Sequence, residues 1–303
     1  MAKYKFYTTD VFTNIIFGGN PLAVFPDARG MSSELMQKIA KEFNLSETTF
    51  VFPPENPNNT KQLRIFTPVN ELPFAGHPTV GTAYVLASIG DITLENETTE
   101  IIFEEKVGPV GVSIQSQDGK PKSAYLTVAQ LPKFGPSPPE PSIIANALSL
   151  DKEDLLLGDW NPEAVSCGLP FFFIPVRDRK ILGKAAVNLE CWKKHLQSPW
   201  FENLYIFCFD PEHPEANLRS RMFGPAFGII EDPATGSAAS ALAGYLGVRE
   251  SASHGELQWI VEQGVEMGRP SILYVQAHKA NGRIETVRVG GESVMVSEGT
   301  IEV

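Results

Sequence analysis

The sequence predicts an α/β (α+β) protein built from two similar domains, and three observations support this prediction. The 303 residues are about the length of two ordinary domains, each large enough to bury its own core. Short β-branched and aromatic runs alternate with amphipathic segments, so strands and helices are expected in both halves. The motif Arg64–Pro68 returns as Arg221–Pro225, and a glycine-led helix follows each copy, which indicates a duplicated fold.

The N-terminal half alternates turn signals with short apolar runs. A helix capped by Ser32 or Ser33 is expected, because apolar side chains recur on one face at Leu35, Met36, Ile39 and Phe43. A second helix is expected from Gly76 to about Ala87. The expected strands cover residues 4–11, 20–26, 48–52, 62–66, 101–103, 110–114 and 124–128.

The C-terminal half follows a segment with five prolines, Pro132–Pro141, which we interpret as a linker. Helices are expected at residues 142–148, 152–156, 187–196 and 236–246, and strands at 171–176, 204–209 and 218–223. Asn281-Gly282 and Gly290-Gly291 are typical hairpin turns. The predicted domains are residues 1–129 and 130–291, and the final strand, 292–303, can return to the first domain.

Charge and composition exclude several classes of protein. Lys and Arg total 25 against 36 Asp and Glu, a net charge of −11, which argues against binding to nucleic acid or anionic lipid. No apolar run approaches the roughly 18 residues of a membrane span, and the N-terminus has no secretion signal, so a cytoplasmic protein is expected. Three cysteines without a CxxC motif predict buried apolar thiols rather than disulfides or a zinc knuckle.

Two helix starts have the composition of an anion-binding site. A helix N-terminus presents unpaired N–H groups and a partial positive charge. Gly76 and Gly236 let the backbone approach a ligand closely, and Pro78 suits a first helical turn. Each motif is compatible with an ordinary capped helix, but their pairing through the repeat favours convergence on one small carboxylate substrate.

Several titratable side chains lie close to these elements. His77 follows a glycine at a helix start, where the helix dipole lowers its pKa and a neutral imidazole can transfer a proton; the alternative is local capping or packing. Asp232 precedes a proline and is either an Asx-turn residue or a carboxylate that receives a proton or orients an amine. Glu47 and Glu71 lie between elements, where a glutamate is usually solvated.

Other common catalytic motifs are missing from the sequence. It contains no GxxxxGK[ST], no GxGxxG after a strand, no GxSxG and no HExxH. Its five histidines, at positions 77, 195, 213, 254 and 278, lack the spacing of metal ligands. Nucleotide-binding, serine-hydrolase and zinc-enzyme interpretations therefore lose support, and no metal site is expected.

Six motifs in a fixed order support a more specific interpretation. They are Asp10–Thr13, Gly19–Val24, Asn44–Thr48, Arg64–Pro68, Glu71–Thr82 and Glu231–Ala239. Through them the sequence resembles, essentially end to end, the PhzF-like phenazine biosynthesis family, which shares its fold with diaminopimelate epimerase. The resemblance implies two pseudo-symmetric domains, each a mostly antiparallel sheet wrapped around a central helix. It also implies an active site in the cleft between the domains.

The resemblance also implies roles for individual residues. Glu47 matches the family's proton donor and acceptor, and His77, Asp232 and Ser237 match residues that line the cleft. The family uses no cofactor, and its best-known member isomerises a dihydro-hydroxyanthranilate. We expect the substrate to contact Gly76, Gly236, Ser237, Asn20 and Thr235, and we expect a homodimer.

We therefore predict a cofactor-independent isomerase of a small carboxylate-bearing metabolite that resembles trans-2,3-dihydro-3-hydroxyanthranilate isomerase. One alternative is an epimerase or racemase of an amino or hydroxy acid, in which Asp232 or His77 would act opposite Glu47. The two-cysteine mechanism of the epimerase branch is disfavoured, because Cys167, Cys191 and Cys208 match neither helix start. A second alternative is a non-catalytic protein of the same fold that binds a small molecule.

Overall fold

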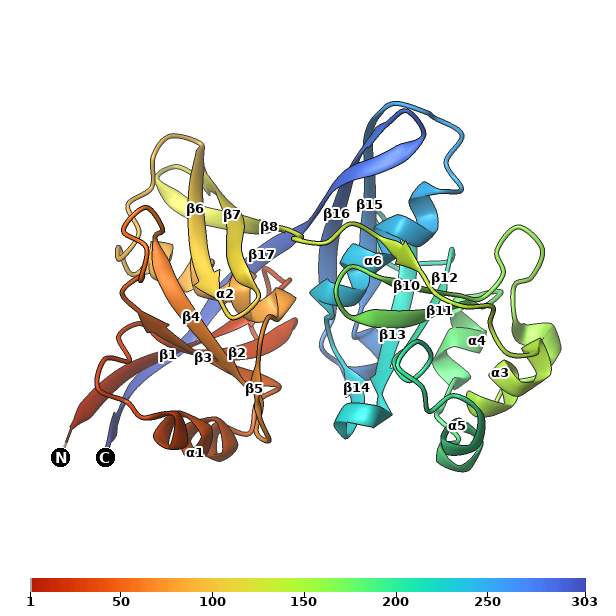
Figure 1. Ribbon diagram of the computed structural model, residues 1–303, viewed down its shortest axis with the longest axis horizontal. Helices are drawn as coiled ribbons and strands as arrows, with labels where there is room; N and C mark the ends of the chain where they lie inside the picture. Colours follow the sequence, from red (N-terminus) through yellow and green to blue (C-terminus); the bar gives the residue numbers. More distant parts are fainter. Residues whose placement is uncertain (1) are drawn as a thin grey trace. The chain divides into compact units, whose positions relative to one another are not determined.

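The computed structural model describes residues 2–303, which form two compact units. The first unit runs to Thr127 and also contains Val289–Val303, and the second unit is Val128–Arg288. Each unit has its own strands and helices (Figure 1). The protein is therefore an α+β protein, as predicted.

The first unit contains the N-terminal strands and two helices. Its helices are α1 (Ser33–Phe43) and α2 (Gly76–Ser88). Its strands are β1 (Lys3–Val11), β2 (Asn20–Phe25), β3 (Glu47–Phe52), β4 (Lys61–Phe66), β5 (Glu71–Leu72), β6 (Thr98–Glu105), β7 (Gly108–Gln117), β8 (Lys120–Thr127) and the last part of β17 (Arg283–Glu302).

Strand pairing in the first unit mixes parallel and antiparallel neighbours. β1 pairs antiparallel with β2, β2 parallel with β3, and β3 antiparallel with β4. β4 then pairs antiparallel with β5 and parallel with β6, and β6, β7 and β8 follow as an antiparallel meander. β17 pairs antiparallel with β1, which places Lys3 opposite Glu302.

Helix α2 forms the centre of the core of the first unit. Its sequence is apolar on all sides, and all of its residues except Tyr84 and Ser88 are buried, as expected of a helix inside a core. It contacts β1, β2, β3, β7 and β8. A Cβ atom at Gly81 would lie 2.5 Å from a Val11 methyl and 2.7 Å from a Leu22 methyl, so the glycine permits this close packing.

Helix α1 leads the chain into β3, where Glu47 is located. The hydroxyl of Ser32 accepts a hydrogen bond from the Leu35 N–H at the start of the helix, and Asn44 ends it in a left-handed conformation. Its buried side chains pack with a group of phenylalanines, namely Phe25, Phe50 and Phe66. The helix end and this packing together determine where β3 begins.

The second unit contains the remaining elements. Its strands are β9 (Lys133–Phe134), β10 (Glu163–Ser166), β11 (Pro170–Pro175), β12 (Leu204–Cys208), β13 (Leu218–Gly224), β14 (Ile229–Asp232), β15 (Gly255–Gln263), β16 (Ser271–Ala280) and the first part of β17. Its helices are α3 (Pro141–Ala147), α4 (Arg179–Lys184), α5 (Leu189–His195) and α6 (Gly236–Gly247). Short 3₁₀ turns are η1 (Lys152–Asp154), η2 (Pro225–Phe227) and η3 (Val265–Met267).

The paired strands of the second unit pack around helix α6. β9 pairs antiparallel with β10 and β10 antiparallel with β11, while β11 and β12 are parallel. β13 pairs antiparallel with β12 and β14 and parallel with β15, which is antiparallel to β16. Every residue of α6 except Ser237 is buried, and the helix contacts β10, β11, β15 and β16. Side chains from α3, α4 and α5 build a separate apolar cluster with β11 and β12.

The proline-rich segment does not act as a linker. The chain passes between the units at Thr127 and Val128, so Pro132–Pro141 lies inside the second unit. Lys133 pairs with Ser166 in a short strand, and Pro141 opens α3. Prolines are tolerated at strand edges and at the first position of a helix, which explains how this composition fits into a folded unit.

The two glycine-containing turn signals have different outcomes. Asn281 and Gly282 both have positive φ angles and connect β16 to β17, so this predicted hairpin is confirmed. The predicted turn at Gly290-Gly291 is wrong, because both residues lie within the continuous strand β17. A Cβ atom at Gly290 would overlap the carbonyl oxygen of Ala124 and the ring of Tyr125. This glycine permits close packing of two chain segments rather than a turn.

The states of the cysteines and the lengths of the helices match what the composition predicted. All three cysteines are free; Cys191 and Cys208 are buried, and Cys167 is partly buried. Within residues 2–303, no helix is both long and apolar enough to span a lipid bilayer.

Candidate active site

Three of the predicted site residues meet in the first unit. Glu47 opens β3, Asn20 opens the neighbouring strand β2, and His77 stands in the first turn of α2. His77 Nε2 lies 3.4 Å from Glu47 Oε2, and His77 Nδ1 lies 3.4 Å from Asn20 Nδ2. Asn20 is fully buried, and the Glu47 side chain is 13% exposed. Glu47 is therefore not a solvated loop residue, because it lies against an imidazole at the edge of the core.

The imidazole of His77 is neutral at physiological pH. Burial lowers the pKa of His77 to about 3, because the side chain is only 5% exposed and a buried cation loses its hydration. The direction is the one expected from its position, but desolvation is the cause. With the Asn20 amide nitrogen facing Nδ1, that ring nitrogen is the acceptor, and the ring proton on Nε2 faces Glu47. The Glu47–His77 contact is therefore not an ion pair.

The start of α2 lies next to this group. Ala75 occupies the N-cap position and has no side chain that can cap the helix. The N–H groups of Gly76 and His77 are the first two of the helix, and such groups have no partner inside it. Together with the positive end of the helix dipole, they can stabilise a carboxylate.

Asp232 is the last residue of β14 in the second unit, and the turn that follows it is held by buried polar contacts. Its Oδ2 accepts a hydrogen bond of 2.5 Å from the Thr235 hydroxyl. The fully buried Gln263 donates to the Asp232 carbonyl at 2.8 Å and to Thr235 Oγ1 at 3.1 Å, and its Oε1 accepts from the Thr235 N–H at 3.3 Å. Gln263 thus fixes the whole turn from Asp232 to the start of α6.

The start of α6 resembles the start of α2 in its lack of a cap. Thr235 occupies the N-cap position, but its hydroxyl bonds Asp232 instead of the helix N–H groups. Gly236 is buried, and Ser237 is partly exposed in the first turn. The N–H groups of this turn are available to a carboxylate in the same way.

Each arginine of the repeated motif forms an ion pair with a glutamate that precedes one of the two central helices. Arg64 binds Glu71 through two hydrogen bonds of 2.7 Å, and Arg221 binds Glu231 through two of 2.8 Å. Lys106 also pairs with Glu71 at 2.7 Å. The cations lower the pKa of Glu71 against the opposing effect of burial. Glu71 is therefore a largely buried ion-pair partner rather than a solvated residue.

Sequence reasoning missed two polar residues next to these helix starts. The Glu105 carboxyl is hydrogen-bonded to the Thr79 hydroxyl in the first turn of α2, and Gln263 holds the turn before α6. Both follow a buried strand residue at an interval of two, Phe103 in β6 and Val261 in β15. Side chains two residues apart in a strand lie on the same face, so both residues lie on the buried face. This alternation is the sequence signal that could have identified them as buried polar residues.

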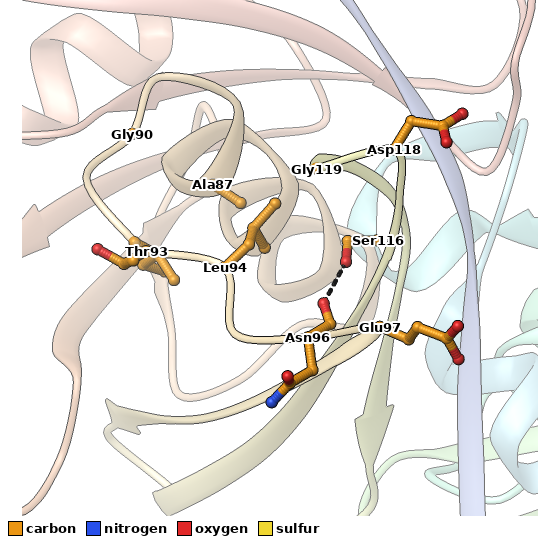
Figure 2. Close-up of a pocket in the computed structure, with 10 residues that line it drawn as sticks. Ala87, Gly90, Thr93, Leu94, Asn96, Glu97, Ser116, Asp118 and Gly119 are labelled. Atoms are coloured by element: carbon orange, nitrogen blue, oxygen red, sulfur yellow. Dashed lines mark hydrogen bonds between the residues drawn. The ribbon is translucent and has the colours of Figure 1, made fainter.

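A surface pocket lies away from all of these residues. Its volume is about 690 Å³, and it is lined by Ala87 from α2 together with residues of the loops before β6 and between β7 and β8 (Figure 2). Ala87 is near the C-terminal end of α2, about 16 Å along the helix from Gly76 at 1.5 Å per residue. The lining carboxylates, Glu97 and Asp118, are exposed. The group of Glu47 and His77 is therefore a better candidate for the active site than this pocket.

Within the described chain, no group of three His, Cys, Asp or Glu side chains is arranged to hold a metal ion.

Comparison with known proteins identifies the class. The chain is 37% identical over 304 residues to an uncharacterized isomerase of Mesorhizobium japonicum, covering 99% of both chains. It is 35% identical over 300 residues to trans-2,3-dihydro-3-hydroxyanthranilate isomerase of Pseudomonas aeruginosa, covering 98% of both. The predicted isomerase class is confirmed by these relatives.

Family and fold agree with this class. A model of the PhzC-PhzF family, described as phenazine biosynthesis-like protein, matches residues 9–299. The crystal structure of a PhzF-family phenazine biosynthesis protein from Bacillus anthracis superimposes with a TM-score of 0.90 at 26% identity, covering 100% of both chains. A hydroxyproline epimerase from Agrobacterium vitis has a similar fold, with a TM-score of 0.64 at 13% identity over 99% of this chain and 92% of that one. The chain belongs to the phenazine biosynthesis-like PhzC-PhzF family, as its motifs predicted.

Proposed function

We propose that the protein isomerises a small conjugated carboxylate of the dihydro-hydroxyanthranilate type by removing a proton from one carbon and returning it to another. The observation that carries this proposal is the Glu47 carboxylate, held 3.4 Å from a neutral imidazole beside an uncapped helix start. Its relatives include a trans-2,3-dihydro-3-hydroxyanthranilate isomerase that covers nearly the same length.

The proposal includes pseudo-symmetry between the two units and a substrate site in a cleft between them. The order of strand pairings supports the pseudo-symmetry. In each unit an antiparallel pair is followed by a parallel pair and then by a second antiparallel pair. The fourth strand of this series, β4 or β13, has one further antiparallel partner and one parallel partner. The proposed cleft rests on the family resemblance, which assigns Glu47 of the first unit and Asp232 of the second to one site.

Glu47 is the proposed acid and base. Its carboxylate takes a proton from a carbon that conjugation has made acidic, and the electron pair of the broken C–H bond moves into the conjugated system. The protonated Glu47 then gives the proton to a second carbon, which shifts the double bond and restores the carboxylate. A neutral His77 assists this cycle, because it leaves Glu47 more basic than a cationic neighbour would.

The remaining residues bind and orient the substrate in this proposal. The N–H groups at Gly76 and Gly236 stabilise the substrate carboxylate, and the Ser237 hydroxyl contributes a further hydrogen bond. Asp232 holds the substrate amine or hydroxyl, with Thr235 fixing its carboxylate. Asn20 keeps the imidazole of His77 in one tautomer. A homodimer in the cytoplasm, with no nucleic-acid or membrane partner, completes the proposal and rests on composition and family resemblance.

The test follows hydrogen isotopes in the product. The protein is incubated in D₂O with trans-2,3-dihydro-3-hydroxyanthranilate and a panel of related amino and hydroxy acids, and each compound is followed by NMR. We expect a shifted double bond, and deuterium at the carbon that receives the proton to the extent that the carboxyl proton of Glu47 exchanges with solvent before it is returned. Deuterium that enters, with inversion of configuration, at the same carbon from which the proton was removed would instead indicate an epimerase. Tight binding without any exchange would indicate a binding protein.

A further inference from the structure

Glu105 is a buried carboxyl that the mechanism above does not use. It is the last residue of β6, and its side chain lies on the same buried face as Ile101 and Phe103. Glu105 is only 8% exposed. Its Oε1 lies 2.6 Å from Thr79 Oγ1, and among the described residues its Oε2 has no hydrogen-bond partner. A carboxylate in this position would be poorly solvated.

The number of available protons decides which form of Glu105 fits. Thr79 Oγ1 is within hydrogen-bond distance of two acceptors, the Ala75 carbonyl at 2.7 Å and Glu105 Oε1 at 2.6 Å. A hydroxyl has one proton, so it satisfies only one of them. When Glu105 is protonated, its O–H donates to Thr79 and the Thr79 O–H donates to Ala75, and all three groups are bonded in one chain.

No cation compensates a charge on Glu105 in the described structure. Its two neighbours in the chain are engaged elsewhere: Glu104 accepts from N–H groups of the loop before β4, and Lys106, directly after β6, pairs with Glu71. β7, which pairs with the end of β6, contains no charged residue. The other titratable groups on the adjoining helix α2 and strand β4 are His77, Tyr84, Lys61 and Arg64. Of these, Lys61 pairs with Asp91 and Arg64 with Glu71.

We propose that Glu105 is a positioning residue that acts, in its protonated form, through Thr79 on the Ala75–Gly76 peptide. The Ala75 carbonyl and the Gly76 N–H belong to the same peptide group. A hydrogen bond to that carbonyl orients the peptide and polarises its N–H, which is the first N–H of the uncapped helix start. The protonated Glu105 thus holds the Gly76 N–H in the direction of an anionic ligand. The role in catalysis rests on the proposed function.

Ionisation of Glu105 reverses this arrangement. The Thr79 proton then turns to the carboxylate, and the Ala75 carbonyl loses its hydroxyl donor. Burial raises the pKa of Glu105 to about 8, while the hydrogen bond from Thr79 opposes the shift. The protonated form therefore persists at neutral pH, and the device weakens in the alkaline range.

The first measurement needs no substrate. The amide NMR signal of Gly76 is followed from pH 6 to pH 10 in the wild type and in Glu105→Gln, whose side-chain amide still donates to Thr79. We expect the signal to shift with a midpoint near pH 8 in the wild type and to stay constant through that range in Glu105→Gln. Glu100→Gln, an exposed change in the same strand, is the matched control and should follow the wild type. The inference is overturned if wild type and Glu105→Gln give the same curve.

The second measurement is the pH profile of kcat/KM. We expect the alkaline fall near pH 8 to be absent in Glu105→Gln, and Thr79→Val to lower kcat/KM by on the order of tenfold. Thr79→Ser keeps the hydroxyl and should restore most of that loss. Should Thr79→Ser be as impaired as Thr79→Val, the hydroxyl relay is refuted. If no variant and no wild type turns over the substrate, the proposed function fails, while the Gly76 signal still decides the role of Glu105.

Discussion

The strands β2–β3 of the first unit and β11–β12 of the second pair in the same way but carry different chemistry. Both pairs are parallel, and the second strand of each begins opposite a residue of the first, Glu47 opposite Leu22 and Leu204 opposite Phe172. In the first unit this starting residue is a carboxylate beside His77; in the second it is a fully buried leucine. The comparison teaches that one unit has a carboxylate beside an imidazole where the other has an apolar core residue.

The two central helices differ in the same sense. The start of α2 is surrounded by titratable side chains, with His77 in its first turn and Glu105 bonded to Thr79. The turn before α6 is held by the neutral Gln263, which bonds to Thr235 and to the backbone of Asp232. A neutral amide fixes a turn at every pH, whereas the hydrogen bonding at α2 changes with protonation. We therefore expect the first unit to be the pH-sensitive one.

The largest expected effect comes from placing a carboxylate at the equivalent strand start. Leu204→Glu should lower the free energy of unfolding by at least about 3 kcal/mol, because Leu204 lies in the apolar cluster of the second unit, where a carboxyl finds no partner. Urea denaturation measures the loss, and Leu204→Met, which keeps the volume, should cost less than about 1.5 kcal/mol. Equal losses for the two variants would mean that packing alone governs this position.

The repeated arginines provide a second way to separate the units. Arg221→Gln should lower the free energy of unfolding by about 3 kcal/mol, because its largely buried partner Glu231 would remain unpaired. Arg221 also donates to the carbonyl oxygens of Leu182 within α4 and of Ala185 directly after it. Arg64→Gln should cost only about 1 kcal/mol, since Arg64 is 24% exposed and Glu71 keeps Lys106. The comparison fails if Arg64→Gln proves the more damaging change.

The effect that is smallest at neutral pH is a pH dependence of stability that arises from His77 and accumulates only on acidification. Its pKa is about 3 in the folded protein against an ordinary value of 6.5, so between these values only the unfolded state binds the proton. Stability is therefore lost as the pH falls from about 6.5 toward 3, by up to about 1.4 kcal/mol per pH unit from this group. Urea denaturation at several pH values should give a shallower dependence for His77→Gln, and parallel curves would contradict the burial of His77.

Much of this architecture could be predicted from local sequence. The caps and the apolar stripe gave α1, and the small apolar composition after Gly76 and Gly236 gave both central helices. The errors have one physical origin, because Pro132–Pro141 and Gly290-Gly291 were interpreted by local propensity alone. The close packing of Gly290 against Ala124 and the strand that contains Lys133 both depend on distant parts of the chain.

The residues of the candidate site also fall into two groups, those that the sequence identified and those that only the structure shows. Motifs identified Glu47, His77 and Asp232 as candidates, because each belongs to a short sequence at a strand start or just before or within the first turn of a central helix. Glu105 and Gln263 are the last residues of their strands and belong to no motif, and their partners, Thr79 and Thr235, are 26 and 28 residues away in the chain. Only the folded structure brings such pairs together.

The most direct test of the central claim, that Glu47 carries the proton, compares carboxamide substitutions in the two units. Deuterium incorporation from D₂O into the isomerised product is measured for the wild type, Glu47→Gln, Asp232→Asn and the exposed control Glu100→Gln. We predict that Glu47→Gln lowers the rate by about 10³-fold, within the range known for general acid–base groups, and that Asp232→Asn lowers it less. Turnover by Glu47→Gln within tenfold of the wild type, with Asp232→Asn inactive, would contradict the account and transfer the role to the second unit.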